Sequence, residues 1–217
     1  MNKQIAKHFL YGLVVLSLVF FVMPAHAQQQ DSLSTDINQS RNKQIKHILD
    51  YRFKGGAGAF ESELLKHVSY TPEALNNCVI GTVILSFTVD CDNKIGDLRM
   101  RNPLHFGLNE KLQAFFKATE GQWNTCKDDR YTKFEIPVLF TIGKTETSAK
   151  GFVIIEGESP GLRCKSDAYY MEQFEKWRNK GKVKRAIESL DMLIRRDPYN
   201  QSYFDLKKEL LTSSEKD

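Results

Sequence analysis

The chain alternates apolar and polar side chains in three places, and each alternation predicts a strand. Over residues 79–89 apolar side chains recur at every second position, which is typical of a strand with one buried face. Polar residues 91–94 form the predicted turn, and residues 95–102 form the returning strand. Residues 131–142 form the third strand, which carries Phe134, Ile136, Val138 and Phe140 on one face.

Helical periodicity predicts most of the remaining elements. Apolar side chains over residues 60–68 follow the spacing of one helix face, and Pro72 suits the start of a short helical turn. Asn109 is the expected N-cap of a helix over residues 108–118. Three further helices are expected towards the C-terminus, over residues 167–180, 183–196 and 201–211.

These elements predict an α+β fold, in which a small antiparallel sheet packs with two helices and is followed by an α-helical hairpin with a capping helix. The predicted organisation is residues 1–27 as a signal peptide, 28–50 as a flexible leader with a short helix, 51–145 as the α+β domain, 146–166 as a linker with a candidate extra strand at 151–156, 167–212 as the helical region, and 213–217 as a tail.

The N-terminus has the pattern of a cleavable secretory signal. Lys3 and Lys7 precede an apolar run over residues 9–23, and an Ala-His-Ala cleavage site ends at Ala27. The run is shorter than the ~20 residues of a spanning helix, so we expect cleavage before Gln28 rather than a retained anchor. Removal of the two lysines lowers the net charge from +4 to +2, which does not favour nucleic-acid binding.

All four cysteines follow the predicted cleavage site, and an even number in an oxidising compartment favours disulfides. Their wide spacing excludes the close pairs of a zinc site, and no metal or other cofactor is expected. Neither the histidines at 47, 67 and 105 nor any nucleophile forms a catalytic motif, so no catalytic residue is expected and we predict that the chain is not an enzyme. Asp90, Asp92 and Asn93 fit a solvated hairpin turn better than a calcium loop.

Several motifs stand in an order that resembles the C-terminal domain of the TonB family, in the variant common in Bacteroidetes. They are Gly55-Gly56, Tyr70-Thr71-Pro72, Gly81 before the first strand, Leu108-Asn109-Glu110, Trp123 and Ile136-Pro137 with Phe140. The resemblance implies a periplasmic module of a Gram-negative cell that binds a protein or peptide, such as an outer-membrane receptor or envelope complex. A homodimer remains an alternative.

The chain departs from that family in two ways. Asn124 stands where the family usually has Pro shortly after the Trp, and a long Pro-rich spacer is absent. We therefore expect a TonB-like fold without the force-transmitting role. The alternative is an energy-transduction component of the TonB system, anchored in the inner membrane and facing the periplasm.

The resemblance also implies where a partner would bind, because such domains add an extended peptide to an open sheet edge. The third strand is the candidate edge, with binding residues Tyr131, Lys133, Phe134, Glu135, Ile136, Pro137, Val138 and Phe140. The alternative is that residues 151–156 cover this edge. The predicted course of the strands and helix pairs Cys91 with Cys126 at one end of the sheet and Cys78 with Cys164 at the other.

The helical region resembles a single tetratricopeptide unit. The matching residues are Trp177, Gly181, Ala186, Leu190, Leu193 and Pro198, whereas Phe174 occupies a usually small position. A single unit buries its apolar face poorly, so it should dock on the first domain or on a partner. Trp177 is expected in the core of the helix pair rather than at a binding surface, and Lys182, Lys184 and Arg185 on a solvated helix face.

Overall fold

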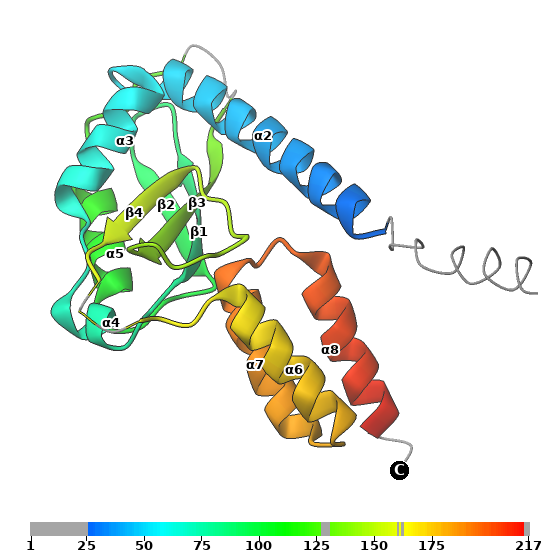
Figure 1. Ribbon diagram of the computed structural model, residues 1–217. Coiled ribbons are helices and arrows are strands. Elements are labelled where there is room, and N and C mark those ends of the chain that lie inside the picture. The colour runs from blue at the N-terminus through cyan, green and yellow to red at the C-terminus, as the bar shows by residue number, and fades with distance from the viewer. Residues whose placement is uncertain (1–25, 127–130, 160, 162, 215–217) are drawn as a thin grey trace, which may run out of the picture. The chain divides into compact units, whose positions relative to one another are not determined.

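A computed structural model describes residues 26–126, 131–159, 161 and 163–214 (Figure 1). The chain divides into two units, residues 1–37 and 38–217, and all the described elements belong to the second unit except for the start of the first helix. Most of the predicted signal peptide lies outside the described residues. The elements, in order, are α2 (His26–Arg52), α3 (Gly56–His67), α4 (Pro72–Asn76), β1 (Gly81–Val89), β2 (Ile95–Arg101), α5 (Leu108–Ala118), β3 (Lys133–Ile142), β4 (Val153–Gly157), α6 (Asp167–Asn179), α7 (Val183–Arg196) and α8 (Gln201–Ser214).

The α+β fold class is confirmed, and the predicted strands and helices are present with small shifts of their ends. The sheet has the order β2-β1-β3-β4. It is mixed rather than wholly antiparallel, because β1 runs antiparallel to both neighbours while β4 pairs parallel with β3. The candidate extra strand within the predicted linker is therefore an integral part of the sheet.

Two local predictions are wrong. The flexible leader expected over residues 28–40 is instead part of α2, where the short helix expected before Tyr51 extends back through a stretch with four Gln residues of good helix propensity. The N-cap of α5 is Gly107, in the left-handed region at φ 82°, rather than Asn109. Asn109 lies one position inside the helix, where its Oδ1 accepts a hydrogen bond from Leu104 N at 3.0 Å.

The main core lies between one face of the sheet and the helices α3 and α5. Phe87 on β1 and Phe134 on β3 stack at 4.8 Å between ring centroids, and Trp123 packs edge-on against both rings. Phe53 and Phe60 extend this aromatic cluster from the chain before β1, and Trp123 is fully buried. The regular period of two along β1 and β3 thus produces one continuous apolar layer.

β1 is buried on both faces over its first half, which corrects the prediction of a half-buried strand. Thr82 and Ile84 on the outer face are 0% and 3% exposed. The reason is that the C-terminal end of α7 packs there, and Thr82 Oγ1 donates to Arg196 O at 2.8 Å. Asn102, just after β2, donates its Nδ2 to Thr82 O at 2.7 Å and to Arg195 O at 2.6 Å. The sheet thereby supplies donors to the free carbonyls at the end of α7.

The helices α6, α7 and α8 have a second core of their own around Phe174, Leu190 and Leu193, all fully buried. This helical region is attached to the sheet at the end of α7, which is one of the two dockings expected for it. Arg196, buried at the end of α7, joins α7 to the start of α6: its Nη1 donates to Asp167 Oδ1 and its Nη2 to Lys165 O, both at 2.6 Å.

Both predicted disulfides are present, Cys78–Cys164 and Cys91–Cys126. Such bonds are those of a chain that folds in an oxidising compartment. Among the helices of the described residues, none is long and apolar enough to cross a bilayer.

Candidate functional site

β3, the predicted binding edge, is an interior strand. It pairs with β1 from Lys133 to Phe140 and with β4 from Val138 to Ile142. The prediction that this strand offers an open edge to a partner is therefore wrong, and the alternative, a strand within residues 151–156 that covers it, is close to what the structure shows.

Pro137 marks the point where the pairing with β4 begins. Its carbonyl accepts from Phe152 N at 2.8 Å, so the position of its missing N–H also faces the β4 side. The stretch before Pro137 has β1 on one side only, as expected for a strand that contains proline.

α2 contacts the chain near both ends of that remaining stretch of β3. At one end, Asn42 Nδ2 donates to Gly151 O at 3.1 Å, in the loop that leads to β4. At the other end, the rings of His47 and Tyr51 pack edge-on against Tyr131, just before β3. A helix laid over an otherwise unpaired strand is one of the usual ways to protect an edge.

The predicted binding residues divide between the two faces of the sheet. Phe134, Ile136, Val138 and Phe140 point into the core and are at most 6% exposed. Glu135 points outward, where its carboxylate forms an ion pair with Arg101 at 2.6 Å and accepts from the Tyr199 hydroxyl at 3.2 Å. These contacts are internal to the protein: the first set belongs to the core, and Glu135 joins β3 to β2 and to the segment before α8.

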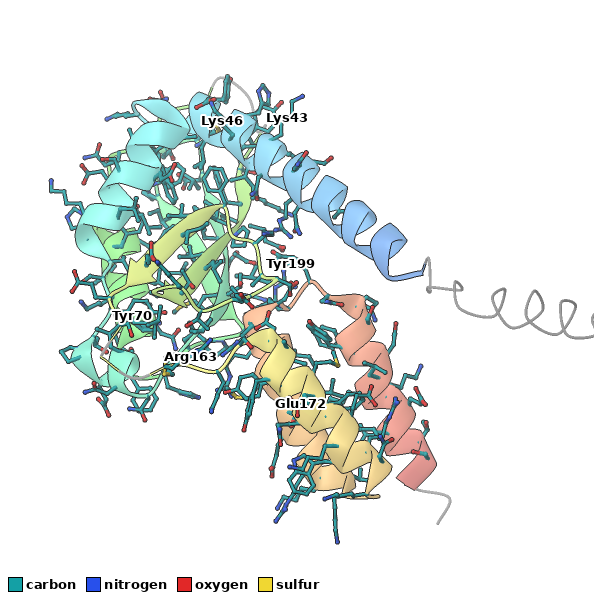
Figure 2. All side chains as sticks on the ribbon, viewed as in Figure 1. Lys43, Lys46, Tyr70, Arg163, Glu172 and Tyr199 are labelled. Atoms are coloured by element: carbon teal, nitrogen blue, oxygen red, sulfur yellow. A yellow bond between two sulfur atoms is a disulfide. The ribbon has the colours of Figure 1, made fainter. Side chains whose placement is uncertain are left out.

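Tyr199 lies at the centre of a polar cluster on the outer face of the sheet (Figure 2). The guanidinium of Arg41 stacks on its ring at 3.9 Å from the centroid. Burial raises the pKa of the Tyr199 hydroxyl to about 12, and burial also raises the pKa of Asp197 and lowers that of Arg41. Because each group has a partner within the cluster, the shifts indicate a structural contact between the helical region and the sheet rather than a catalytic pair.

The outer strands of the sheet are β2 and β4. β2 carries the features that protect an edge: the register of its pairing with β1 shifts at Ser86–Thr88, Asp97 has a positive φ of 50°, and Arg99 and Arg101 are exposed. β4 has neither a register shift nor a residue of positive φ, and its one charged side chain is Glu156. Its sequence is Val-Ile-Ile-Glu-Gly, and Ile154 is 51% exposed.

Two glycines allow β4 to take its place beside β3. A Cβ on Gly151 would lie 2.8 Å from Leu139 N, and one on Gly157 would lie 2.6 Å from the ring of Tyr70 and from Leu75. Both positions therefore require the missing side chain for close approach. The two glycines that flank a short apolar run were the sequence signal for an integrated strand here.

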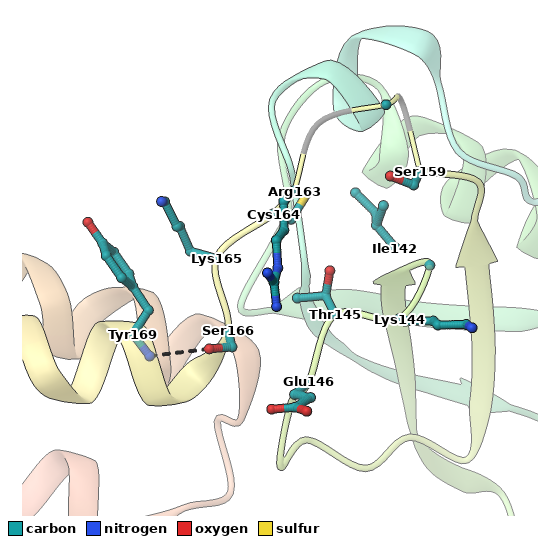
Figure 3. Close-up of a pocket in the computed structure, with 12 residues that line it drawn as sticks. Ile142, Lys144, Thr145, Glu146, Ser159, Arg163, Cys164, Lys165, Ser166 and Tyr169 are labelled. Carbon is teal, nitrogen blue, oxygen red and sulfur yellow. Dashed lines mark hydrogen bonds between the residues drawn. The ribbon is translucent and has the colours of Figure 1, made fainter.

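A cavity of about 820 Å³ lies between the end of β3 and the segment before α6 (Figure 3). Its walls carry charges of both signs, from Lys144, Glu146, Arg163 and Lys165. Lys144 and Lys165 extend away from each other rather than towards a common point. These two ammonium groups therefore do not converge on one ligand position.

No cluster of His, Cys, Asp and Glu suited to a metal occurs among the described residues. Asp90 serves the hairpin turn itself, where its Oδ1 accepts from Asp92 N at 2.9 Å and from Lys94 N at 2.8 Å. The site that the geometry favours is therefore the edge of β4. Comparison with models of protein families, with curated proteins and with solved structures gives no match for this chain.

Proposed function

We propose that the protein is a binding module that pairs an extended segment of a partner protein with the free edge of β4. The observation that carries the proposal is the composition of that edge: an apolar strand with half-exposed Ile154, at the end of a sheet whose other edge is charged and irregular. An unprotected apolar edge strand is a template for pairing with another chain.

The partner segment is expected to be extended and partly apolar. Main-chain hydrogen bonds to β4 supply affinity without regard to sequence, while Ile154 on the outer face selects an apolar side chain opposite it. Glu156, also exposed on this face, favours a basic or neutral residue two positions along the partner.

The site of action that we propose is the periplasm. The support is the signal-like N-terminus, which ends at Ala27, and the two disulfides. The resemblance to the TonB C-terminal domain favours an outer-membrane receptor or an envelope complex as the source of the partner segment.

Peptide selection tests the binding proposal. Peptides selected from a displayed random library on the oxidised protein should lose affinity on the order of tenfold or more with Ile154→Lys, because the substitution replaces an apolar contact by a charge on the pairing edge. The matched control is Leu65→Lys, which makes the same kind of change at an exposed aliphatic side chain on α3. Backbone amide shifts on peptide binding should concentrate at 153–157.

Two results would contradict the proposal. One is amide shifts that concentrate on β2 instead of β4. The other is an equal loss of peptide affinity for Ile154→Lys and Leu65→Lys, which would show that the edge of β4 contributes no more to peptide binding than a surface position on α3.

Intact mass of the protein from fractionated cells tests the export proposal. A periplasmic species that begins at Gln28, with no thiol available to alkylation before reduction, supports it. A membrane-bound species that begins at Met1 would instead support the anchored energy-transduction alternative.

A further inference from the structure

The turn between α6 and α7 is the most basic part of the described surface. Residues 176–185 contain six cationic side chains and no acidic one. All six are exposed, and together with Trp177 they define what we call the basic tip: Lys176, Arg178, Lys180, Lys182, Lys184 and Arg185.

Trp177 lies among these cations. The Arg185 guanidinium is 4.6 Å from the centroid of the indole ring, and the ammonium groups of Lys176 and Lys180 are 5.2 Å and 5.7 Å from it. The indole is only half-buried against the helical core, whose fully buried aromatic residue is Phe174. Trp177 thus has one side packed on the apolar core and one edge in solvent, with cations around it. Such a side chain is stable where an apolar phase meets a polar one.

Folding accounts for only part of this charge. Lys176 and Arg178 lie in the last turn of α6, where cations stabilise the helix, and Arg178 also pairs with Glu175 at 2.7 Å. Lys184 and Arg185 lie in the first turn of α7, which contains no acidic residue and where cations are unfavourable. Within the described residues no ion pair involves Lys180, Lys182 or Lys184, so their charge is left for an external partner.

The basic tip lies at the end of the helix pair that faces away from the attachment to the sheet. The attachment is made by the other end, through the carbonyls of Arg195 and Arg196 and through Asp167, whose carboxylate accepts from Ser148 N in the loop before β4. The 13 residues of α6 separate the two ends by about 20 Å. The cavity beside the end of β3 is lined by residues 142–169, so it does not reach this turn.

We propose that the basic tip binds the anionic headgroups of a phospholipid bilayer, with Trp177 at the interface. A protruding turn with dispersed cations fits a flat surface of many phosphates, whereas a single phosphorylated ligand or an acidic peptide would be held by a pocket or groove. Clusters of Lys and Arg bind anionic bilayers through additive attraction, and Trp is enriched at the headgroup level. This inference is independent of the edge of β4.

Vesicle binding tests the proposal with the full chain. The protein should sediment with vesicles of phosphatidylglycerol and phosphatidylcholine, and high salt should release it. The variant Lys180→Gln/Lys182→Gln/Lys184→Gln/Arg185→Gln should bind on the order of a thousandfold more weakly. The matched control removes four charges from exposed lysines elsewhere, as Lys66→Gln/Lys117→Gln/Lys133→Gln/Lys150→Gln, and should change binding much less. Both variants keep the N-terminal segment, so its contribution cancels in the comparison.

Tryptophan fluorescence gives a second readout at the site itself. Of the two tryptophans, Trp123 is fully buried, so a blue shift on addition of anionic vesicles reports on Trp177 and should disappear in Trp177→Phe. Equal losses for the two charge variants would overturn the proposal. So would binding to a DNA duplex or to polyglutamate that matches the binding to vesicles, because the tip would then recognise another class of polyanion.

Discussion

Arg52 is a fully buried arginine whose guanidinium bonds to main-chain carbonyls. It donates to Asp90 O at 3.0 Å, to Tyr131 O at 3.1 Å and to Asn124 O at 3.3 Å. One side chain at the end of α2 thereby holds the hairpin turn and the segment before β3, on either side of Cys91–Cys126.

We expect Arg52→Met to lower the free energy of unfolding by roughly 3 kcal/mol, because it leaves several partly buried carbonyls without donors. Urea unfolding of the oxidised protein measures this loss. Arg99→Met, at an exposed position on β2, provides the control and should change stability by no more than about 0.5 kcal/mol. A loss at Arg52 no larger than that of the control would show that water or another group satisfies these carbonyls.

Asp197 predicts a dependence of stability on pH. Burial raises the pKa of its carboxyl, against the opposing effects of the hydrogen bond from Tyr199 N and the charge of Arg41. The ordinary pKa of 3.8 applies to the unfolded chain, so Asp197 loses its proton there at a lower pH than in the folded protein. Stability therefore falls as pH rises through this range, because the ionised carboxylate is less favourable in the fold than in water. Asp197→Asn should therefore stabilise the protein at neutral pH, and the gain should vanish below about pH 4.

Thermal unfolding of wild type and Asp197→Asn across this pH range provides the measurement. Asp92→Asn, at the exposed hairpin turn, reports what the same substitution does without burial. A gain for Asp197→Asn that persists unchanged in acid would refute the electrostatic explanation.

Among the elements, the contact between α7 and the start of β1 depends on a glycine. A Cβ at Gly81 would lie 2.7 Å from Arg195 O and 2.9 Å from the Leu104 side chain. Gly81→Ala should destabilise the protein by about 1–3 kcal/mol, because the end of α7 must move off the sheet. Gly58→Ala in α3 meets nothing within 4 Å and should stabilise by roughly 0.5–1 kcal/mol. Chemical denaturation of Gly81→Ala and Gly58→Ala tests the contact. Equal changes in the free energy of unfolding would show that the end of α7 moves off the sheet without cost.

At the scale of the whole molecule, the two disulfides connect distant parts of one compact unit. Cys78–Cys164 spans 86 residues and Cys91–Cys126 spans 35. Chain entropy predicts a loss of about 4 kcal/mol on removal of either bridge, somewhat larger for the longer loop. Paired Cys→Ser variants, compared by urea unfolding, test the order. A clearly larger loss from the Cys91–Cys126 pair would show that the bridge acts through the native contacts of Arg52 rather than through the unfolded chain.

The period of the apolar side chains predicted nearly all the strands and helices, because that signal is local. It could not predict that α7 packs on the outer face of β1, since Thr82 and Ile84 have the pattern of a solvent-facing row. Nor does a sequence distinguish Arg52 from an exposed arginine, because its acceptors are carbonyls of residues up to 79 positions away. The open edge was misplaced for the same reason: whether residues 151–156 pair with β3 depends on the three-dimensional approach that Gly151 and Gly157 allow.

Because the parallel strand β4 belongs to the same chain, a free peptide would have to compete with it for the second side of β3. It is joined to β3 by a loop of only ten residues, so it is present at an effective concentration on the order of millimolar for a short linker. A free peptide at micromolar concentration could not displace it from β3 unless its intrinsic affinity were far higher. A partner segment that binds as we propose would therefore extend the sheet beyond β4 rather than exchange with it, and the core beneath β3 would stay covered when the partner binds.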